Sequence, residues 1–161
     1  MRSIVRMTTL AIETELGTIE LRLRPDAAPV TVKHVCEAVQ GGLYNNTCFY
    51  RSDFVIQCGL HGTTRSHPNG DLPINETNVP GLQSISNTRG TVAIAHFDVP
   101  DNGSTEFFIN LKHNAHLDSV YGGYCVFAQV ETSESFAVVD AIASAITNRG
   151  SKPRILRMSL K

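Results

Sequence analysis

After a short irregular start, apolar and polar residues alternate along the chain. The apolar positions of this alternation are Leu10, Ile12, Ile19, Leu21 and Leu23. A period of two is typical of a β-strand with one buried face, because successive side chains point to opposite sides of a sheet. The alternation is interrupted at residues 15–18, which include Gly17, and this interruption predicts the turn of a β-hairpin.

Two other segments have the apolar spacing of amphipathic helices. Their apolar positions are Val32, Val35, Cys36 and Val39 in the first segment, and Val138, Val139, Ile142 and Ile146 in the second. Ala28-Pro29 precedes the first segment and Gly41-Gly42 follows it, while the second ends at residues 148–150. Proline is favoured at the first helical position and glycine after the last, so these residues predict where both helices begin or end.

Short apolar runs between Gly, Pro, Asn or Asp residues predict further strands. These runs are residues 48–50, 54–58, 91–96, 107–111 and 125–130, and Leu156, Met158 and Leu160 alternate as a last strand. Residues 59–80 are rich in Gly, Pro, Asn and His, with Leu72 and Ile74 as the main apolar residues. They predict a long surface loop of a kind that is usually functional or mobile.

The number of strands relative to helices sets the fold class. A doubly wound sheet needs a helix after nearly every strand, and this chain has only two predicted helices. A closed antiparallel β-barrel is therefore predicted, because closure leaves no exposed sheet edge and two amphipathic helices can cover its open ends.

Length and charge indicate one globular domain. The chain has 161 residues, of which 42% are hydrophobic, and this suits a single domain over residues 1–161 with a flexible extension at residues 1–8. Lys and Arg number 14 against 15 Asp and Glu, without a basic stripe. Nucleic acid is therefore not an expected partner, and a monomer is the default expectation.

The cysteines and the start of the chain bear on location. Cys36, Cys48, Cys58 and Cys125 form neither a C-x-x-C pair nor a compact framework, which favours a reducing compartment. The start lacks an apolar run of signal-peptide length, and no segment is apolar for long enough to span a membrane. A cytoplasmic or nuclear protein without a membrane partner is expected.

Two blocks of sequence resemble the signature blocks of the cyclophilin family. The first is residues 48–59, Cys-Phe-Tyr-Arg-Ser-Asp-Phe-Val-Ile-Gln-Cys-Gly, and the second is residues 104–110, Ser-Thr-Glu-Phe-Phe-Ile-Asn. Shorter matches occur at residues 17–19, 44–47, 87–91 and 124–127. Several separated motifs in the family's order are more specific than one short pattern, and the resemblance covers nearly the whole chain from about Leu10.

The resemblance implies a mainly β fold, an eight-stranded antiparallel barrel capped by two helices, with a substrate groove on its outer surface. It implies a peptidyl-prolyl cis/trans isomerase that binds proline-containing segments, assists protein folding and needs no cofactor. The catalytic residues that it implies are Arg51, Phe54, Gln57 and Phe108. The substrate-binding residues that it implies are Val55, Ala95, His96, Glu106, His116, Leu117 and Tyr124.

The chemistry of X-Pro rotation suits these residue types. Amide resonance opposes the rotation with a barrier of about 18–20 kcal/mol, although the cis and trans states differ by only about 0.5–1 kcal/mol. A catalyst must hold the proline ring and stabilise the twisted state, in which the prolyl nitrogen regains its lone pair. Phe54 and Phe108 offer apolar walls, Arg51 offers a permanently charged donor, and Gln57 could orient Arg51.

Three positions depart from the family's common pattern. Tyr50 stands where His is usual, and Glu106 stands where Gln is usual, so a carboxylate could pair with Arg51. His116 occupies the position of a Trp that the family associates with cyclosporin, so weak cyclosporin binding is expected. The segment between Arg51 and Phe54 is also shorter than the common pattern, and the groove could be reshaped there.

Several of these residues, and the chain as a whole, also allow other interpretations. By pattern alone Phe108 would be a core residue and Arg51 a surface ion-pair partner. Cys58 and His61 suggest a zinc site, but no second Cys/His pair completes the usual four ligands, so no metal is expected. Two alternative functions are a weakly active or inactive proline-peptide binding module and a small-molecule carrier. The carrier is disfavoured because side chains can fill an eight-stranded barrel.

Overall fold

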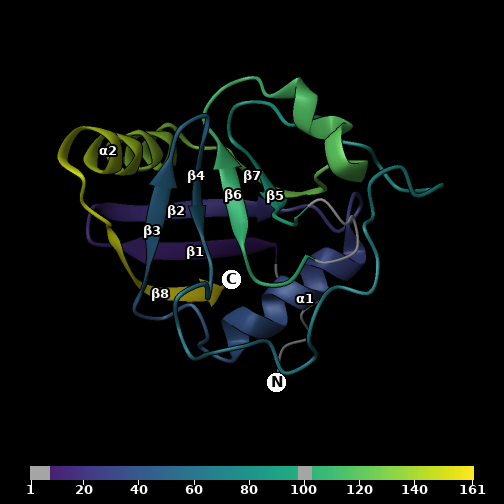
Figure 1. The fold of residues 1–161 in the computed structure, drawn as a ribbon, viewed down its shortest axis with the longest axis horizontal. Helices are drawn as coiled ribbons and strands as arrows, with labels where there is room; N and C mark the ends of the chain where they lie inside the picture. Colours follow the sequence, from purple (N-terminus) through teal and green to yellow (C-terminus); the bar gives the residue numbers. More distant parts are fainter. Residues whose placement is uncertain (1–7, 98–102) are drawn as a thin grey trace.

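The structure, a computed structural model, describes residues 8–97 and 103–161. Over these residues the chain forms a closed antiparallel barrel in the order β1-β2-β7-β5-β6-β4-β3-β8. The strands are β1 (Thr9–Thr14), β2 (Gly17–Leu23), β3 (Thr47–Ser52), β4 (Val55–Cys58), β5 (Thr91–Ile94), β6 (Phe107–Asn110), β7 (Val126–Val130) and β8 (Arg154–Leu160). Helices α1 (Pro29–Gln40) and α2 (Ser133–Arg149) lie at opposite ends of the barrel (Figure 1), so the predicted fold class is confirmed.

The first hairpin has the predicted alternation and turn. β1 and β2 pair from Thr9↔Arg22 to Thr14↔Gly17, so Glu15 and Leu16 alone make the turn. Gly17 has a φ of +129°, and a Cβ there would lie 2.7 Å from Cγ2 of Val138 on α2. Glycine is therefore needed at this position both for its backbone conformation and for the close approach of the helix.

Both helices have the predicted boundaries: α1 begins at Pro29 and stops before Gly41, and α2 stops before Gly150. α1 begins at Pro29, and its first N–H groups are capped from a distant loop by Glu76, which accepts from the N–H groups of Val30 (3.1 Å) and Thr31 (2.6 Å). α2 is capped by the side chain of Thr132, and it ends where Gly150 takes the left-handed conformation. These caps satisfy donors and acceptors that a helix leaves unpaired at its ends.

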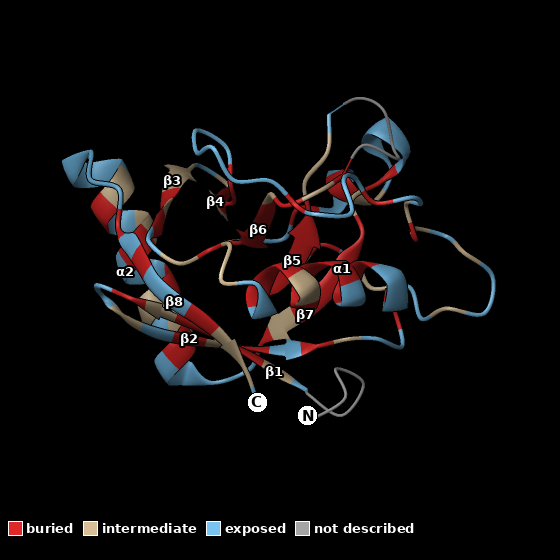
Figure 2. Cartoon of the chain, turned by 90° about the horizontal axis from the view of Figure 1, so that it is seen from below, coloured by how far each residue is buried: buried red, intermediate tan, exposed pale blue. Residues whose placement is uncertain are grey.

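The interior of the barrel is filled with side chains. Phe107 packs edge-on against Tyr44 (5.6 Å between ring centroids) and Phe127 (5.8 Å), and all three are fully buried. The Tyr44 hydroxyl donates to the carbonyl of Thr105 at 2.8 Å, so its polar atom is satisfied. Figure 2 shows buried residues on the strands and exposed residues on the long loops and the outer face of α2. This packing disfavours the small-molecule carrier that the sequence left open.

One prediction about β8 is wrong. The alternation of Leu156, Met158 and Leu160 predicted one buried face, but Leu156 is 41% exposed and Ile155 is fully buried. The pairing of β8 with β1 shifts register here, because Glu13 pairs with Arg157 while Thr14 pairs with Ile155. Leu156 is thus the extra residue of a β-bulge, which reverses the alternation on its far side.

Other element boundaries differ from the predicted ones by one to three residues, as is usual at element ends. The long loop differs more: it was predicted over residues 59–80 and extends to Gly90. The strand predicted over residues 91–96 ends at Ile94. Two short 3₁₀-helices, η2 (Ala115–Asp118) and η3 (Val120–Gly122), were not predicted. Of the predicted extension, residues 1–7 lie outside the described residues. Thr8 lies just before β1 and is tied to the end of the chain after β8, since its N–H donates to the carbonyl of Lys161.

The long loop is attached to α1 by a pair of stacked histidines. The rings of His34 and His67 lie 3.7 Å apart, nearly parallel, and each residue is only 5% exposed. Nδ1 of His67 accepts from the N–H of Asn69, so its Nε2 carries the proton and donates to the carbonyl of His34 at 2.9 Å. Burial and the neighbouring His67 lower the pKa of His34. The folded structure therefore favours the neutral form of His34.

This pair is expected to make the fold less stable in acid. A lowered pKa means that the unfolded chain binds a proton more readily, so the contribution of His34 is complete above pH about 6.5 and is lost as the pH falls through its folded pKa. Urea unfolding at pH 7, 6 and 5 should show the decline, at most about 1.4 kcal/mol per pH unit for one histidine. His34→Phe should flatten this slope, while the exposed His113→Asn should not. Equal slopes in wild type and His34→Phe would contradict the assignment.

Candidate active site

A groove of about 580 Å³ lies on the outer surface of the barrel. Its apolar lining belongs to a small cluster separate from the barrel interior, formed by Val55, Ala93, Phe108, Leu117 and Val126, with Phe54, Ile85, Ala95 and Tyr124 packed against it. Because side chains alternate along β6, Phe107 points into the barrel while Phe108 points out into the groove. The two neighbouring phenylalanines therefore serve the core and the groove separately.

Arg51 lies beside this apolar cluster. It is opposite Gln57 in the β3–β4 pairing, and its Nη1 donates to Oε1 of Gln57 at 3.0 Å, so the predicted contact is present. Its Nε donates to Oδ2 of Asp53 at 2.9 Å, and its guanidinium carbon lies 5.3 Å from the centre of the Phe54 ring. No hydrogen bond among the described residues uses Nη2, and the side chain is 40% exposed. Arg51 is thus held from two sides and can still donate to a ligand.

Glu106 does not pair with Arg51, so that prediction is wrong. Its Oε1 accepts from the Tyr50 hydroxyl and its Oε2 accepts from the N–H of His61 at 2.9 Å. Gly59 makes this placement possible, because a Cβ at residue 59 would lie 1.7 Å from Oε2 of Glu106 and 2.8 Å from its Cα. The carboxylate beside Arg51 is that of Asp53, which lies in the turn between β3 and β4.

His96 and Tyr124 form one wall of the groove. Their rings stack with centroids 4.2 Å apart, and Nε2 of His96 lies 2.8 Å from the carbonyl oxygen of Gly123. Tyr124 also meets Phe108 edge-on at 5.7 Å, which connects this wall to the apolar cluster. Ala95 precedes His96, and its N–H donates to the carbonyl of Glu106.

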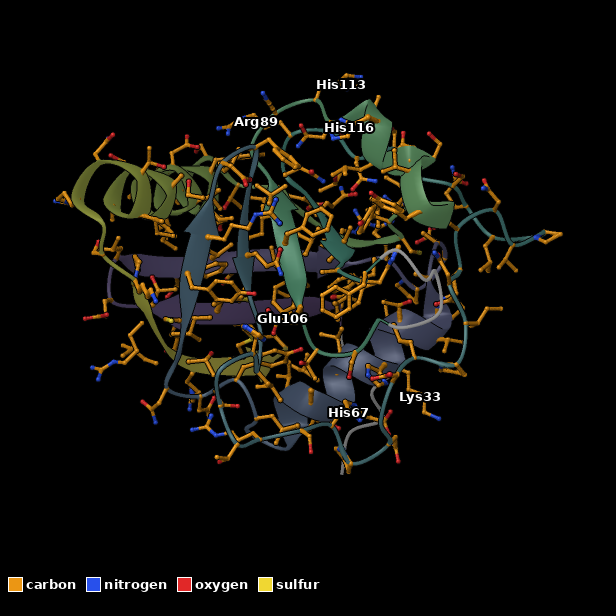
Figure 3. All side chains as sticks on the ribbon, viewed as in Figure 1. Lys33, His67, Arg89, Glu106, His113 and His116 are labelled. Atoms are coloured by element: carbon orange, nitrogen blue, oxygen red, sulfur yellow. The ribbon has the colours of Figure 1, made fainter. Side chains whose placement is uncertain are left out.

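All but one of the predicted site residues line the groove. The exception is His116 on η2, which is exposed and meets the Phe54 ring edge-on at 5.5 Å (Figure 3). In that view Glu106 lies at the start of β6 and His116 lies above its far end, while His67 of the groove lining lies on the other side of Glu106 from His116. His116 is therefore at the rim, where a large ligand that overlies Phe54 would reach it.

Nine further residues that the sequence did not predict line the groove. The additional lining residues are Leu60, His61, Arg65, Ser66, His67, Asp71, Phe97, Ser104 and Thr105. Most belong to the long loop, which has no periodicity from which orientation could be read. The only signal was the length of the loop itself, which favours a functional role.

A buried polar network behind the apolar cluster was also missed. Nδ2 of Asn114 donates to the carbonyl of Phe54 (3.0 Å) and to Oδ1 of Asn110 (2.9 Å), and Nδ2 of Asn110 donates to Oδ1 of Asn87 (3.0 Å). Asn87 in turn donates to the carboxylate of Asp118 on η2. The network ties β6, η2 and Phe54 together from behind. Such amides give no periodic signal, because each one is identified only by its partners.

The sequence suggested two further features near the groove, a reactive cysteine and a metal site, which concern Cys58 and the clusters of possible metal ligands. Cys58 is fully buried in the barrel interior and does not line the groove, and burial raises the pKa of its thiol well above the usual value, as suits a core residue. In residues 8–97 and 103–161, no three His, Cys, Asp or Glu side chains lie together as metal ligands would.

The helices of residues 8–97 and 103–161 include none that is long and apolar enough to cross a membrane.

The closed eight-stranded barrel with two helices and an outer groove is the architecture that the sequence resemblance implied for a cyclophilin-type isomerase. Comparison with known proteins agrees. Residues 9–159 match the family model described as cyclophilin type peptidyl-prolyl cis-trans isomerase/CLD. The chain therefore belongs to this family and is a peptidyl-prolyl isomerase.

Relatives and solved structures extend the comparison. The chain is 36% identical to peptidyl-prolyl cis-trans isomerase B of Escherichia coli, over 87% of each protein. It is 35% identical to a peptidyl-prolyl cis-trans isomerase of Acinetobacter baylyi, over 88% of this chain and 74% of that protein. The fold matches a crystal structure of a Cryptosporidium parvum cyclophilin type isomerase with a TM-score of 0.79, at 19% identity, over 96% of this chain and 98% of that one. None of these relatives supports the inactive binding module.

Proposed function

We propose that the groove is the active site, and that Arg51 is the residue that accelerates rotation about X-Pro bonds in proline-containing segments of other proteins. The observation that carries this proposal is the position of the Arg51 guanidinium against Phe54, at the edge of the apolar cluster of Phe108, Val55 and Leu117. A proline ring fits such a cluster by its size and its lack of polar atoms. The nitrogen of that proline would then face the guanidinium.

The reaction needs only binding and electrostatics. In the planar amide the prolyl nitrogen shares its lone pair with the carbonyl, whereas in the twisted state that lone pair is free to accept a hydrogen bond. A donor aimed at the nitrogen therefore binds the twisted state more strongly than either planar state, and this lowers the barrier. Asp53 and Gln57 hold Arg51 in place beforehand, so little reorganisation is needed during the reaction. No cofactor or metal takes part in this scheme.

The remaining predicted residues are assigned to substrate binding. Tyr124 and the backbone at Ala95 and His96 would hold the peptide along one wall, with Glu106 at the start of β6 and His116 at the rim beside Phe54. A second Cryptosporidium parvum structure, in the presence of the dipeptide ala-pro, matches this fold with a TM-score of 0.78. Such a ligand suits the proposed pocket.

We further propose that the chain acts as a monomeric folding helper in the cytoplasm or nucleus. A groove on the outer surface with an apolar pocket of proline size suits many client segments. All the cysteines are free, and Cys36, Cys58 and Cys125 are buried, which suits a reducing compartment. Fractionation of cells and gel filtration of the purified chain test location and oligomeric state.

A protease-coupled isomerisation assay on an Ala-Pro peptide tests the proposed function. The purified chain should accelerate the exchange of the cis peptide in proportion to its concentration. A chain that binds the peptide, as seen by titration, without accelerating exchange would overturn the proposal in favour of a binding module.

Cyclosporin is expected to inhibit the enzyme weakly. His116 lies at the rim beside Phe54, and an imidazole covers less of a large apolar ligand than an indole does. His116→Trp should therefore tighten inhibition by about tenfold, which corresponds to burying roughly one or two further methylene groups. Inhibition constants measured for both forms check this, with His113→Trp as the control on the same loop. Nanomolar inhibition of the wild type would contradict the assignment.

A further inference from the structure

A chain of hydrogen bonds crosses the polar floor of the groove. Nη1 of Arg51 donates to Oε1 of Gln57 at 3.0 Å, and Nε2 of Gln57 lies 3.0 Å from the Tyr50 hydroxyl. The Tyr50 hydroxyl contacts Oε1 of Glu106, whose other oxygen accepts from the N–H of His61. The chain thus joins Arg51 to Glu106 through two intermediate side chains, although those two residues do not touch.

The direction of this chain is set at its Glu106 end. An ionised carboxylate only accepts hydrogen bonds, so the Tyr50 hydroxyl must donate its single proton to Glu106. Its lone pairs then accept, and Gln57 must present its NH2 group to Tyr50. The carbonyl end of the Gln57 amide consequently faces Arg51. That is the only end a guanidinium can use, because a guanidinium has no acceptor.

The two residues at this end are rigidly placed. Both oxygens of Glu106 are used, and Gly59 leaves the space in which its carboxylate lies. Burial and the hydrogen bond to Glu106 raise the pKa of Tyr50 far above its usual value, so the hydroxyl keeps its proton. Tyr50 also packs near the His61 ring, 6.2 Å between centroids. The donor that sets the direction is therefore always present.

We propose that Tyr50 and Glu106 are positioning residues that fix the direction of the Gln57 amide and thereby hold its carbonyl against Arg51. This inference deepens the proposed function and rests on it. Residues 50 and 106 are the same two positions at which this chain departs from the family's usual His and Gln. The two departures act as one unit, because a tyrosine needs an acceptor-only partner to give the chain a single direction.

The isosteric change Glu106→Gln should reverse or break the chain. If the carbonyl of the new amide keeps the His61 N–H, its NH2 group donates to Tyr50, and Tyr50 must donate to Gln57. The NH2 group of Gln57 then faces Arg51, donor against donor. If the new amide is turned the other way, the hydrogen bond to His61 is lost. The first arrangement is expected, because the backbone N–H of His61 is fixed whereas the Arg51 side chain is 40% exposed and can turn toward water. It loses the charge-assisted hydrogen bond between Arg51 and Gln57, so kcat should fall about tenfold with little change in KM.

The decisive test is the exchange of the two groups. Gln57→Glu alone leaves one hydroxyl proton between two carboxylates. Their repulsion should push residue 57 out of its place against Arg51, so this variant should also lose about tenfold in kcat. In the double variant Gln57→Glu/Glu106→Gln, residue 106 donates to Tyr50, Tyr50 donates to residue 57, and a carboxylate oxygen again faces Arg51. The double variant should therefore be at least threefold faster than either single variant. Glu13→Gln, in an exposed ion pair with Arg157 away from the groove, is the matched control.

The wild type, the two single variants, the double variant and the Glu13→Gln control should also be compared by urea unfolding. The midpoint should fall in each single variant and recover in the double variant, because the broken hydrogen bond affects the fold as well as the rate. Losses that add up in the double variant, or a Glu106→Gln enzyme at the wild-type rate, would overturn the proposed relay. If the wild type itself did not accelerate exchange, the proposed function would fail, and the urea midpoints alone would still decide the relay.

Discussion

Arg51→Ala is expected to lower kcat/KM for an Ala-Pro peptide by about 10²–10³-fold, the usual loss when one preorganised transition-state donor is removed. The effect should be large because the guanidinium is already held by Asp53 and Gln57 beside the apolar cluster. The fold should remain intact, since the side chain is 40% exposed and adds nothing to the barrel interior. Protease-coupled kinetics and circular dichroism measure the two effects.

Arg51→Lys is expected to recover little of this loss. An ammonium is a compact charge without the planar fork that lets Arg51 donate to Gln57 and Asp53 at once. Arg89→Ala is the matched control, because Arg89 pairs with Asp140 and lies over the Phe136 ring in the same way, but away from the groove. An Arg51→Ala enzyme as fast as the wild type would remove Arg51 from the mechanism.

Glu76→Ala is expected to lower the free energy of unfolding by about 2–4 kcal/mol. Glu76 is only 4% exposed, and it accepts from the N–H groups of Val30 and Thr31 and from the Thr31 hydroxyl. Its loss leaves these donors unpaired at the positive end of α1 and releases the long loop from the helix. Urea unfolding at pH 7 measures the change.

Glu76→Gln should give an intermediate loss. Its carbonyl oxygen can keep both bonds to Thr31, but its NH2 group would face the N–H of Val30. The control is Glu134→Ala, since Glu134 is the exposed acidic residue in the first turn of α2, and its loss should cost under about 0.5 kcal/mol. An equal loss in Glu76→Ala and Glu134→Ala would show that the buried cap contributes no more than a surface charge.

The local sequence pattern determined the elements and thereby the fold class. Alternation set the buried faces of β1 and β2, and Pro29 and Gly150 set the start of one helix and the end of the other. These signals work because strand faces, turns and caps depend on residues only a few positions apart. The contact of Arg51 with Gln57 was predictable for the same reason, since both lie in the single hairpin of β3 and β4.

Most of the groove residues came from the family resemblance, because no local pattern tells an outward phenylalanine such as Phe108 from a core residue. The tertiary structure alone decided the partners that lie far apart in the sequence. It placed Glu106 on Tyr50 instead of Arg51, put the bulge at Leu156, and brought Arg65 and Asp71 of the long loop to the groove. Each of these contacts depends on the register between distant strands or on the path of an aperiodic loop. A hydrogen bond needs its two atoms within about 3 Å, and that precision exists only after the barrel has closed.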